Sequence, residues 1–182
     1  IAITGSGTVD GNGARSEDFK CYPLTEDGSK WHKPKRPHLI MFYDCKHIKV
    51  HDITTINPNS WAHHYKLCSF MDIKGVTIHA HANANGDGLD LDECTDVTIS
   101  NCNMDTDDNA LVIKSLGNKD CQNITITNCV FSSKVSSIKT GTESGGGFKD
   151  ITISNSIIRS SYEEEHYDKN RQQMNGSGIV LG

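Results

Sequence analysis

Apolar and polar residues alternate in short runs along most of the chain, as in Val97-Thr98-Ile99 and Ile124-Thr125-Ile126. A period of two is typical of a half-buried β-strand, because successive side chains of a strand point to opposite faces. The period of about 3.6 residues that marks an amphipathic helix is absent from the sequence. The pattern therefore predicts an all-β protein built from short strands.

These runs belong to a motif that recurs five times. The copies begin at Cys45, Cys68, Cys94, Cys121 and Phe148, so their starts lie 23, 26, 27 and 27 residues apart, and each has apolar residues three and five positions further on. A unit of this length cannot bury its own apolar face, whereas stacked units share one continuous core. We therefore predict a solenoid, the parallel β-helix.

A second strand is expected after the polar turn of each copy, at 88–92, 110–114, 137–141 and 178–182. Two sets of residues also keep one position in successive copies: Asn101, Asn128 and Asn155, and Cys102 with Cys129. Residues at one repeat position point the same way, so we expect a hydrogen-bonded ladder of Asn side chains. The cysteines are expected to be small buried residues rather than disulfides.

The whole chain, residues 1–182, is predicted to form a single β-helix domain. A solenoid needs atypical capping repeats, and neither Ile1 nor Gly182 lies in one, because both ends follow the strand pattern. We therefore expect a fragment that lacks terminal coils at both ends. The polar, acidic stretch 162–175 predicts a surface loop.

Composition narrows the class of protein. Of the 182 residues 35% are hydrophobic and 23% are charged, and no apolar run approaches the roughly 20 residues of a membrane span. The net charge of −5 leaves no basic stripe for a nucleic acid. The seven cysteines follow neither a zinc-site spacing nor that of a small disulfide scaffold. Membrane and nucleic-acid partners are therefore not expected.

Acidic residues gather at 85–92 and 105–109, directly before two of the second strands. Asp87 and Asn109 hold equivalent positions and should lie on neighbouring coils roughly 4.8 Å apart, with Asp108 offset by one residue. Close carboxylates push their pKa values apart, so that one keeps its proton while another is ionised, as glycoside hydrolysis requires. From spacing alone, acid–base catalysis, a calcium site and solvated turn residues all remain open.

Three short motifs follow one another inside the repeat, and the pattern Trp61-x-x-His64-x-x-x-Cys68 precedes them. They are Asn85-Gly86-Asp87-Gly88, Asp107-Asp108-Asn109 and Gly141-Thr142-Glu143-Ser144-Gly145-Gly146. In this order they resemble the N-T-D-G, D-D and G-S-E-x-x-G-G motifs of glycoside hydrolase family 28. That family comprises right-handed parallel β-helices of the polygalacturonase and rhamnogalacturonase group. The resemblance extends over about residues 1–160.

The resemblance implies an inverting hydrolase. Asp108 would be the general acid that protonates the leaving oxygen, and Asp87 the base that activates water on the opposite face. Such a pair of carboxyl groups is expected roughly 6.5–9.5 Å apart. Asn109 stands where the family has its second Asp, and Asp107 where it often has Gly. Because an amide cannot accept a proton, we predict that Asp87 is the base alone; the alternatives are that Asp107 takes this role or that the site is weakened.

Further departures concern the substrate. Ser136 aligns with the family's His, and Val180 and Gly182 align with the R-I-K pair that binds a galacturonate carboxylate. Without those cations we expect a rhamnogalacturonan-type linkage rather than homogalacturonan. The candidate substrate-binding residues are Asn85, Asn109, Lys114, Lys139, His64 and Trp61.

The alternative for Lys114 and Lys139 is an ion pair with a carboxylate, and for Trp61 and His64 it is plain packing at a coil corner. No metal or cofactor is expected, since a zinc pair of His79 and His81 would lack a third ligand at a motif spacing.

The sequence thus predicts a secreted or periplasmic monomer acting on a pectic polysaccharide or oligosaccharide. Two other classes of protein remain open. One is a polysaccharide lyase or epimerase on the same scaffold, and the other is a non-catalytic glycan-binding β-helix.

Overall fold

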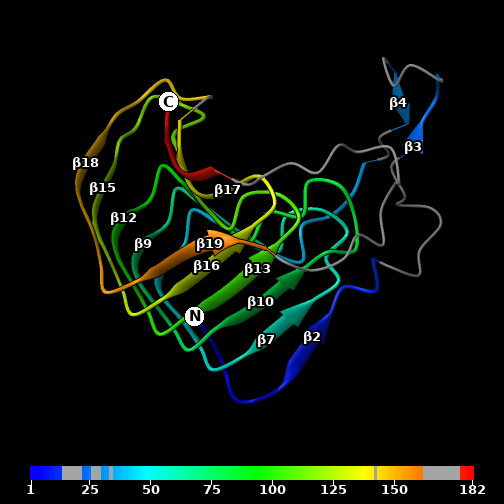
Figure 1. Ribbon diagram of the computed structural model, residues 1–182. Coiled ribbons are helices and arrows are strands. Elements are labelled where there is room, and N and C mark those ends of the chain that lie inside the picture. Colours follow the sequence, from blue (N-terminus) through cyan, green and yellow to red (C-terminus); the bar gives the residue numbers. More distant parts are fainter. Residues whose placement is uncertain (14–21, 26–29, 33–34, 142, 162–176) are drawn as a thin grey trace.

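A computed structural model describes residues 1–13, 22–25, 30–32, 35–141, 143–161 and 177–182 of the chain. Three parallel sheets of six strands each wind around a common axis, and none of the described residues is helical (Figure 1). A small antiparallel pair, β3 (Tyr22–Pro23) and β4 (Trp31–His32), projects away from the stacked sheets. The predicted all-β parallel solenoid is confirmed.

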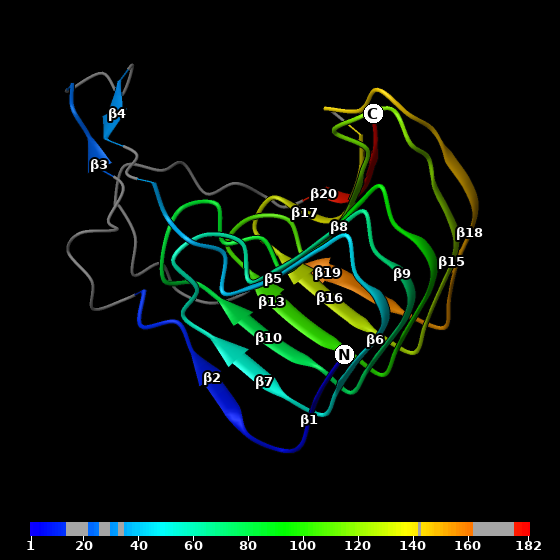
Figure 2. The same cartoon turned by 180° about the vertical axis from the view of Figure 1, so that it is seen from behind.

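Each coil passes through the three sheets in turn, and the view from behind shows the other side of the stack (Figure 2). Sheet 1 consists of β1 (Ala2–Thr4), β6 (Lys46–His51), β9 (Ser69–Lys74), β12 (Thr95–Ser100), β15 (Cys121–Thr127) and β18 (Phe148–Ser154). Sheet 2 consists of β2 (Thr8–Asp10), β7 (Thr54–Ile56), β10 (Thr77–Ala80), β13 (Asn103–Thr106), β16 (Val130–Ser133) and β19 (Ile157–Ser160). Sheet 3 consists of β5 (Ile40–Tyr43), β8 (His63–Lys66), β11 (Leu89–Asp92), β14 (Leu111–Lys114), β17 (Ser136–Thr140) and β20 (Ser177–Leu181).

The coil therefore has three strands where the sequence suggested two. The strand expected in each motif copy divides into a sheet 1 strand and a sheet 2 strand, separated by two residues of which the first has positive φ. In successive coils this residue is Asp52, Gly75, Asn101, Asn128 and Asn155. Among non-glycine residues Asn and Asp adopt this left-handed conformation most readily, which explains the residue types found at the bend.

The expected hydrogen-bonded Asn ladder was wrong. Asn101, Asn128 and Asn155 do form one column, but their side chains are exposed, and no hydrogen bond joins two of them within the described residues. Asn occupies this column because of its backbone conformation. The prediction for the cysteines is confirmed, because Cys102 and Cys129 are buried and free.

The core consists of columns of like residues inside the coil. The register places Ile73, Ile99 and Ile126 opposite one another in sheet 1, and all three are fully buried. Burying one such side chain stabilises the fold by about 1.5–3 kcal/mol. The repeat in the sequence is thus the repeat of the core.

The connections from sheet 2 to sheet 3 are the ones that build a site. Residues 57–62, 81–88 and 107–110 form these connections in three neighbouring coils, and they end at the N-terminal edge of sheet 3. Within the described part of the chain there is no helix of the length and apolarity that crossing a membrane requires.

Candidate active site

One column of residues, called the edge column below, lies at the N-terminal ends of the strands of sheet 3. The register pairs Ile40 with His63, His63 with Leu89, Leu89 with Leu111, and Leu111 with Ile138. The residues two positions before these form the edge column: His38, Trp61, Asp87, Asn109 and Ser136. Contacts between neighbours confirm the column, since the rings of His38 and Trp61 stack with centroids 4.7 Å apart.

The amide of Asn109 connects the two carboxylates that the motifs single out. Its Nδ2 lies 2.9 Å from Oδ2 of Asp87 and 2.9 Å from Oδ1 of Asp108. These two oxygens are therefore no farther apart than twice that distance. An inverting pair is expected to have its carboxyl groups about 6.5–9.5 Å apart. The bound on these two oxygens does not fix the distance between the two carboxyl groups. Each carboxylate also has a second oxygen, which accepts no hydrogen bond from a described residue.

Tight turns hold Asp87 in this place. Asn85 has a φ of 58°, and a Cβ at Gly86 would lie 2.6 Å from the carbonyl oxygen of Ala80. A Cβ at Gly88 would collide with the carbonyl oxygen of Ala110 on the next coil. The glycines on either side of Asp87 are thus required by the close approach of neighbouring backbone.

The surroundings of Asp87 set its protonation. The side chain is 4% exposed, and burial raises its pKa well above the ordinary value, with the charges of Asp90 and Asp108 acting in the same direction. The hydrogen bond from Asn109 and the charge of Lys114 oppose this shift. A carboxylate with a raised pKa is a stronger base once it is ionised.

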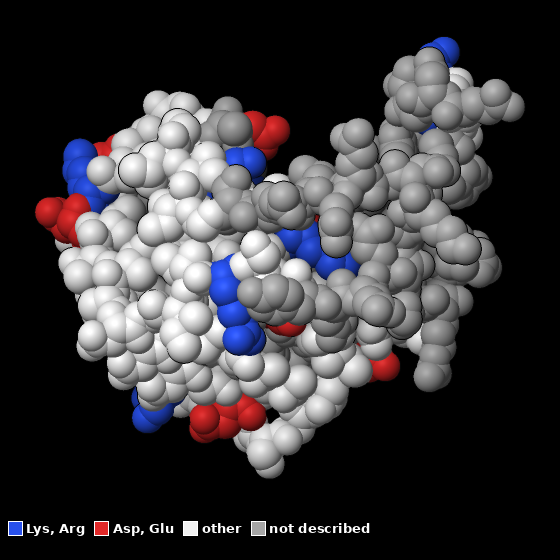
Figure 3. Space-filling view, in the orientation of Figure 1, with Lys and Arg blue, Asp and Glu red and all other residues white. Residues whose placement is uncertain are grey.

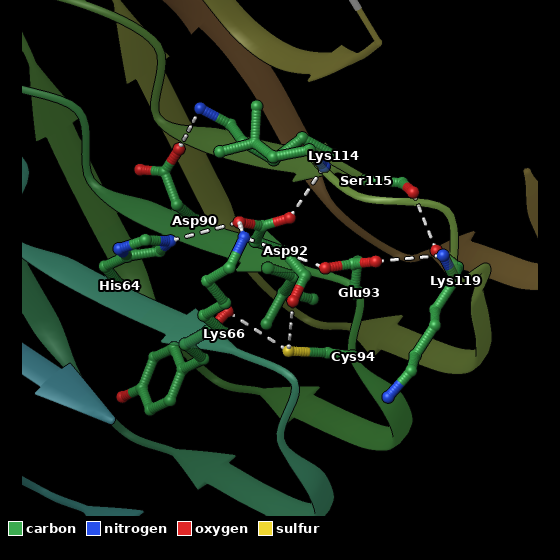
Figure 4. Close-up of polar contacts among 12 residues, drawn as sticks. His64, Lys66, Asp90, Asp92, Glu93, Cys94, Lys114, Ser115 and Lys119 are labelled. Atoms are coloured by element: carbon green, nitrogen blue, oxygen red, sulfur yellow. Dashed lines mark hydrogen bonds and ion pairs between the residues drawn. The ribbon is translucent and has the colours of Figure 1, made fainter. Parts of the chain in front are cut away.

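Two more charged side chains lie beside the carboxylates, on the outer face of sheet 3. Lys114 Nζ is 2.8 Å from Oδ1 of the fully buried Asp90 (Figure 4). It is also 3.9 Å from the centre of the Trp61 ring. Burial raises the pKa of Asp90 to about 6, although Lys114 opposes the shift. Lys114 therefore has the carboxylate partner that the sequence left as an alternative, and it also contacts Trp61.

His64 meets both rings of the edge column nearly edge-on, with centroids 5.0 Å from His38 and 4.9 Å from Trp61. Burial and the neighbouring His38 lower the pKa of His64 to about 4, so this ring is neutral near pH 7. Its contact with Asp92, at 3.6 Å, is therefore not an ion pair at that pH. His38, Trp61 and His64 form a packed aromatic cluster.

Asp92 and Glu93 lie at the C-terminal end of β11, across sheet 3 from the edge column, and each accepts hydrogen bonds there (Figure 4). Asp92 accepts hydrogen bonds from Lys66 Nζ at 2.6 Å and from the backbone N–H of Leu116 at 2.9 Å, while Glu93 accepts one from the N–H of Lys119 at 2.9 Å. The Gly-rich motif packs on the same turn, since Gly146 N–H donates to Ser115 Oγ at 3.0 Å. Thr142 of that motif lies outside the described residues.

Asp107 belongs to a different cluster. Its Oδ1 lies 2.7 Å from His81 Nδ1 and 2.7 Å from Lys134 Nζ. Burial works against ionisation, but these two partners outweigh it and lower the pKa of Asp107. Burial likewise opposes protonation of His81, yet hydrogen bonds and charges of Asp105 and Asp107 raise its pKa to about 9. Figure 3 shows basic side chains on this side of the molecule, over β16 and β19.

The remaining predicted residues lie on the outer face of sheet 3. Lys139 stands between Val112 and Val180 in the register, and within the described residues it forms no ion pair. Ser136 ends the edge column next to Asn109, and its backbone carbonyl accepts a hydrogen bond from Ala110 N–H at 3.0 Å. Among the described residues, Lys139 is therefore a cation of sheet 3 without a carboxylate partner.

Asn85 has a partner that the sequence did not suggest. Arg36 Nη2 donates to Asn85 Oδ1 at 2.9 Å. Arg36 and His38 lie outside the five motif copies, so no periodicity singles them out. Asp90 was visible in the Leu89-Asp90-Leu91-Asp92 alternation, which places it on the outer face near Lys114.

Within the described residues, no three His, Cys, Asp or Glu side chains are placed to hold a metal ion. The arrangement instead offers two carboxylates in different surroundings joined by one amide, next to a buried ion pair and an aromatic cluster. Two such carboxylates can divide the work of proton donor and proton acceptor.

Comparison with known proteins agrees with this chemistry. The sequence model described as Glycosyl hydrolases family 28 matches residues 1–164. A hyperthermoactive exopolygalacturonase from Thermotoga maritima has a similar structure, with a TM-score of 0.63 and 26% identity over 68% of this chain and 30% of its own.

Two further solved structures share the fold. The family 28 exopolygalacturonase of Yersinia enterocolitica gives a TM-score of 0.61 at 15% identity, over 100% of this chain and 47% of its own. The polygalacturonase of Erwinia carotovora ssp. carotovora gives 0.64 at 17% identity, over 100% of this chain and 67% of its own. This chain thus spans less than half the length of the first two of these proteins. Curated protein sequences yield no match.

Proposed function

The chain belongs to glycosyl hydrolase family 28, and from this membership we propose that the protein hydrolyses a pectic polysaccharide with inversion at the anomeric carbon. Asp108 donates a proton to the leaving glycosidic oxygen, and Asp87 removes a proton from the attacking water. The observation that supports the pairing of these carboxylates most directly is the bridge from Asn109, which donates to one oxygen of each. The assignment of acid and base follows the motifs of the family.

Asp87 is the only base in this proposal. Asp107 is paired with His81 and Lys134, and its pKa is lowered, which makes it a poor proton acceptor. The amide of Asn109 cannot serve as a general acid or base, so its role is to hold the acid and the base. A single buried base of raised pKa replaces the carboxylate pair of the family pattern.

The substrate is the finer part of the proposal. Lys139, on the outer face of sheet 3, has no ion-pair partner among the described residues, while Val180 and Gly182 supply no charge at the positions of the family's cations. One cation suits an acidic sugar that alternates with a neutral one, so we propose a rhamnogalacturonan-type backbone. The polygalacturonases among the similar structures favour galacturonan as the second candidate. A pectic substrate also implies a secreted or periplasmic protein, which we propose acts as a monomer.

The test is the release of reducing ends from homogalacturonan and from rhamnogalacturonan by the full-length protein. We expect Asp108→Asn to lower kcat at least about 100-fold, as loss of a general acid does. Asp96→Asn is the matched control, because Asp96 lies on sheet 1 and, of the described residues, its side chain bonds only to Thr95 and Asn123. Anomeric NMR of the first product then reports inversion.

Other outcomes would contradict the proposal in distinct ways. A product with an unsaturated sugar that absorbs in the ultraviolet, formed in a reaction that EDTA stops, would indicate a lyase. Calorimetric binding of an oligosaccharide without any new reducing ends would indicate a glycan-binding protein. Equal turnover by wild type and Asp108→Asn would remove Asp108 from the mechanism.

A further inference from the structure

Arg36 lies four residues before β5 and reaches into the loops that precede β8 and β11. The segment that carries it is fixed by backbone hydrogen bonds, since Leu39 N–H donates to the carbonyl of Trp61 at 3.1 Å and Ile40 N–H to that of Ala62 at 2.9 Å. Its half-buried guanidinium is therefore delivered to one place.

The guanidinium binds three oxygens from two loops. Nη1 donates to the carbonyl of Asn59 at 2.8 Å and to the carbonyl of Ala84, and Nη2 donates to Asn85 Oδ1 at 2.9 Å. Asn59 belongs to the loop 57–62, and Ala84 and Asn85 belong to the loop 81–88, which ends in Asp87. Arg36 thus ties the loop of the proposed base to its neighbour.

All three acceptors are neutral, and Arg36 forms no ion pair with any residue that the structure describes. Among the residues that the structure describes, its charge therefore neutralises no carboxylate. A planar guanidinium presents several N–H groups in a rigid arrangement, whereas the ammonium of Lys is a compact point charge on a flexible stem. Three oxygens in fixed directions match the guanidinium.

Two other hydrogen bonds help to hold this loop before Asp87: Asn83 Nδ2 donates to the carbonyl of Gly13 at 3.3 Å, and Asp108 N–H donates to the carbonyl of Gly86 at 3.4 Å. Asn85 is in the left-handed conformation and Gly86 is pressed against Ala80, so a change at Asn85 propagates directly to the next two residues. The backbone carbonyl of Asp87 accepts a hydrogen bond from Ala62 N–H at 2.8 Å, which links it to the other loop that Arg36 binds. Arg36 thus binds both loops that this hydrogen bond joins, at Asn59 in one and at Ala84 and Asn85 in the other.

We propose that Arg36 is a positioning residue that sets the place of the Asp87 carboxylate by clamping the loops 57–62 and 81–88; this inference rests on the proposed role of Asp87 as base. Arg36 does not exchange a proton itself. It acts on the reaction through Asn85, so its loss displaces the base without removing it.

The kinetic test compares Arg36→Ala, Arg36→Lys and the control Arg159→Ala in the full-length protein on its best pectic substrate. Arg159 is the other described arginine and donates to Ser132 Oγ at 2.9 Å on sheet 2, away from the loops. We expect Arg36→Ala to lower kcat about 10- to 100-fold with KM nearly unchanged, since a displacement of about 1 Å costs this much. The kcat of Arg36→Lys should remain lowered. Millimolar guanidinium should partly restore the kcat of Arg36→Ala and of no other variant.

Hydrogen exchange followed by mass spectrometry provides a test that does not depend on turnover. In Arg36→Ala, amides of 57–62 and 81–88 should exchange faster, while those of β15 should be unchanged. Unchanged exchange in both loops, or a kcat of Arg36→Ala equal to that of Arg159→Ala, would overturn the inference. If the wild type lacks activity on every pectin, the proposed function fails, and exchange in the loops still decides whether Arg36 positions them.

Discussion

Asp87 is a buried acid whose pKa is raised in the folded protein, and this has a consequence for stability. Below the ordinary carboxyl pKa of about 4, the group is protonated in both the folded and the unfolded state. As the pH rises from there to the folded pKa, only the unfolded state ionises freely, so the free energy of unfolding falls. The proposed base is thus retained at a cost in stability near neutral pH.

We therefore expect Asp87→Asn to raise the melting temperature at pH 7 and to leave it nearly unchanged at pH 4. The Asn side chain keeps the acceptor for Asn109 Nδ2 while removing the charge. Asp120→Asn is the control. Lys149 lowers the pKa of Asp120, so the expected change in melting temperature at pH 7 has the opposite sign. Thermal unfolding at the two pH values checks this, and an Asp87→Asn protein that is less stable at pH 7 would contradict it.

At the scale of elements, the Asp90–Lys114 ion pair joins β11 to β14 across the outer face of sheet 3. Asp90 is fully buried and Lys114 is 7% exposed, so water cannot stabilise the charge of one partner when the other is removed. Buried pairs contribute little net stability, yet breaking one is costly.

Lys114→Met should therefore reduce the free energy of unfolding by about 3–5 kcal/mol, because it leaves the Asp90 carboxylate alone in the interior. The double variant Asp90→Leu with Lys114→Met should be much closer to wild type, because no buried charge remains. Lys149→Met, which removes an exposed partner of Asp120, is the control and should change stability little. Urea unfolding measures all three, and a double variant no more stable than Lys114→Met would refute the coupling.

For the whole molecule, the solenoid limits how far a local change spreads. Each coil contacts only the coils on either side, so stability is approximately a sum over neighbours. The strand pairing follows this rule, with β15 hydrogen-bonded to β12 and to β18.

Ile126→Ala in β15 should cost about 2–5 kcal/mol, since it empties a fully buried position of the core column. Amide exchange should rise most in β12, β15 and β18, and least in β6. Thr125→Ala, in the same strand but exposed, should change neither stability nor exchange appreciably. A uniform rise across all coils would show that the chain unfolds as one unit.

The sequence alone determined the solenoid and the proximity of Asp87 to Asn109. Both follow from a repeat, because residues at the same position of successive copies must become neighbours when the copies stack. The resemblance of the motifs to those of the family added the expected roles of Asp87 and Asp108. For Lys114 the sequence left open a substrate contact and an ion pair with a carboxylate.

The tertiary structure alone decided what depends on backbone conformation or on contacts outside the repeat. The bend at Asn101 and Asn128, which divides one expected strand into two, depends on the left-handed conformation of the residue at that bend. The partners of Asp107 come from side-chain directions across two coils. Arg36 lies 49 residues from Asn85 in the chain and has no counterpart in the repeat, so only the folded loops could reveal their contact.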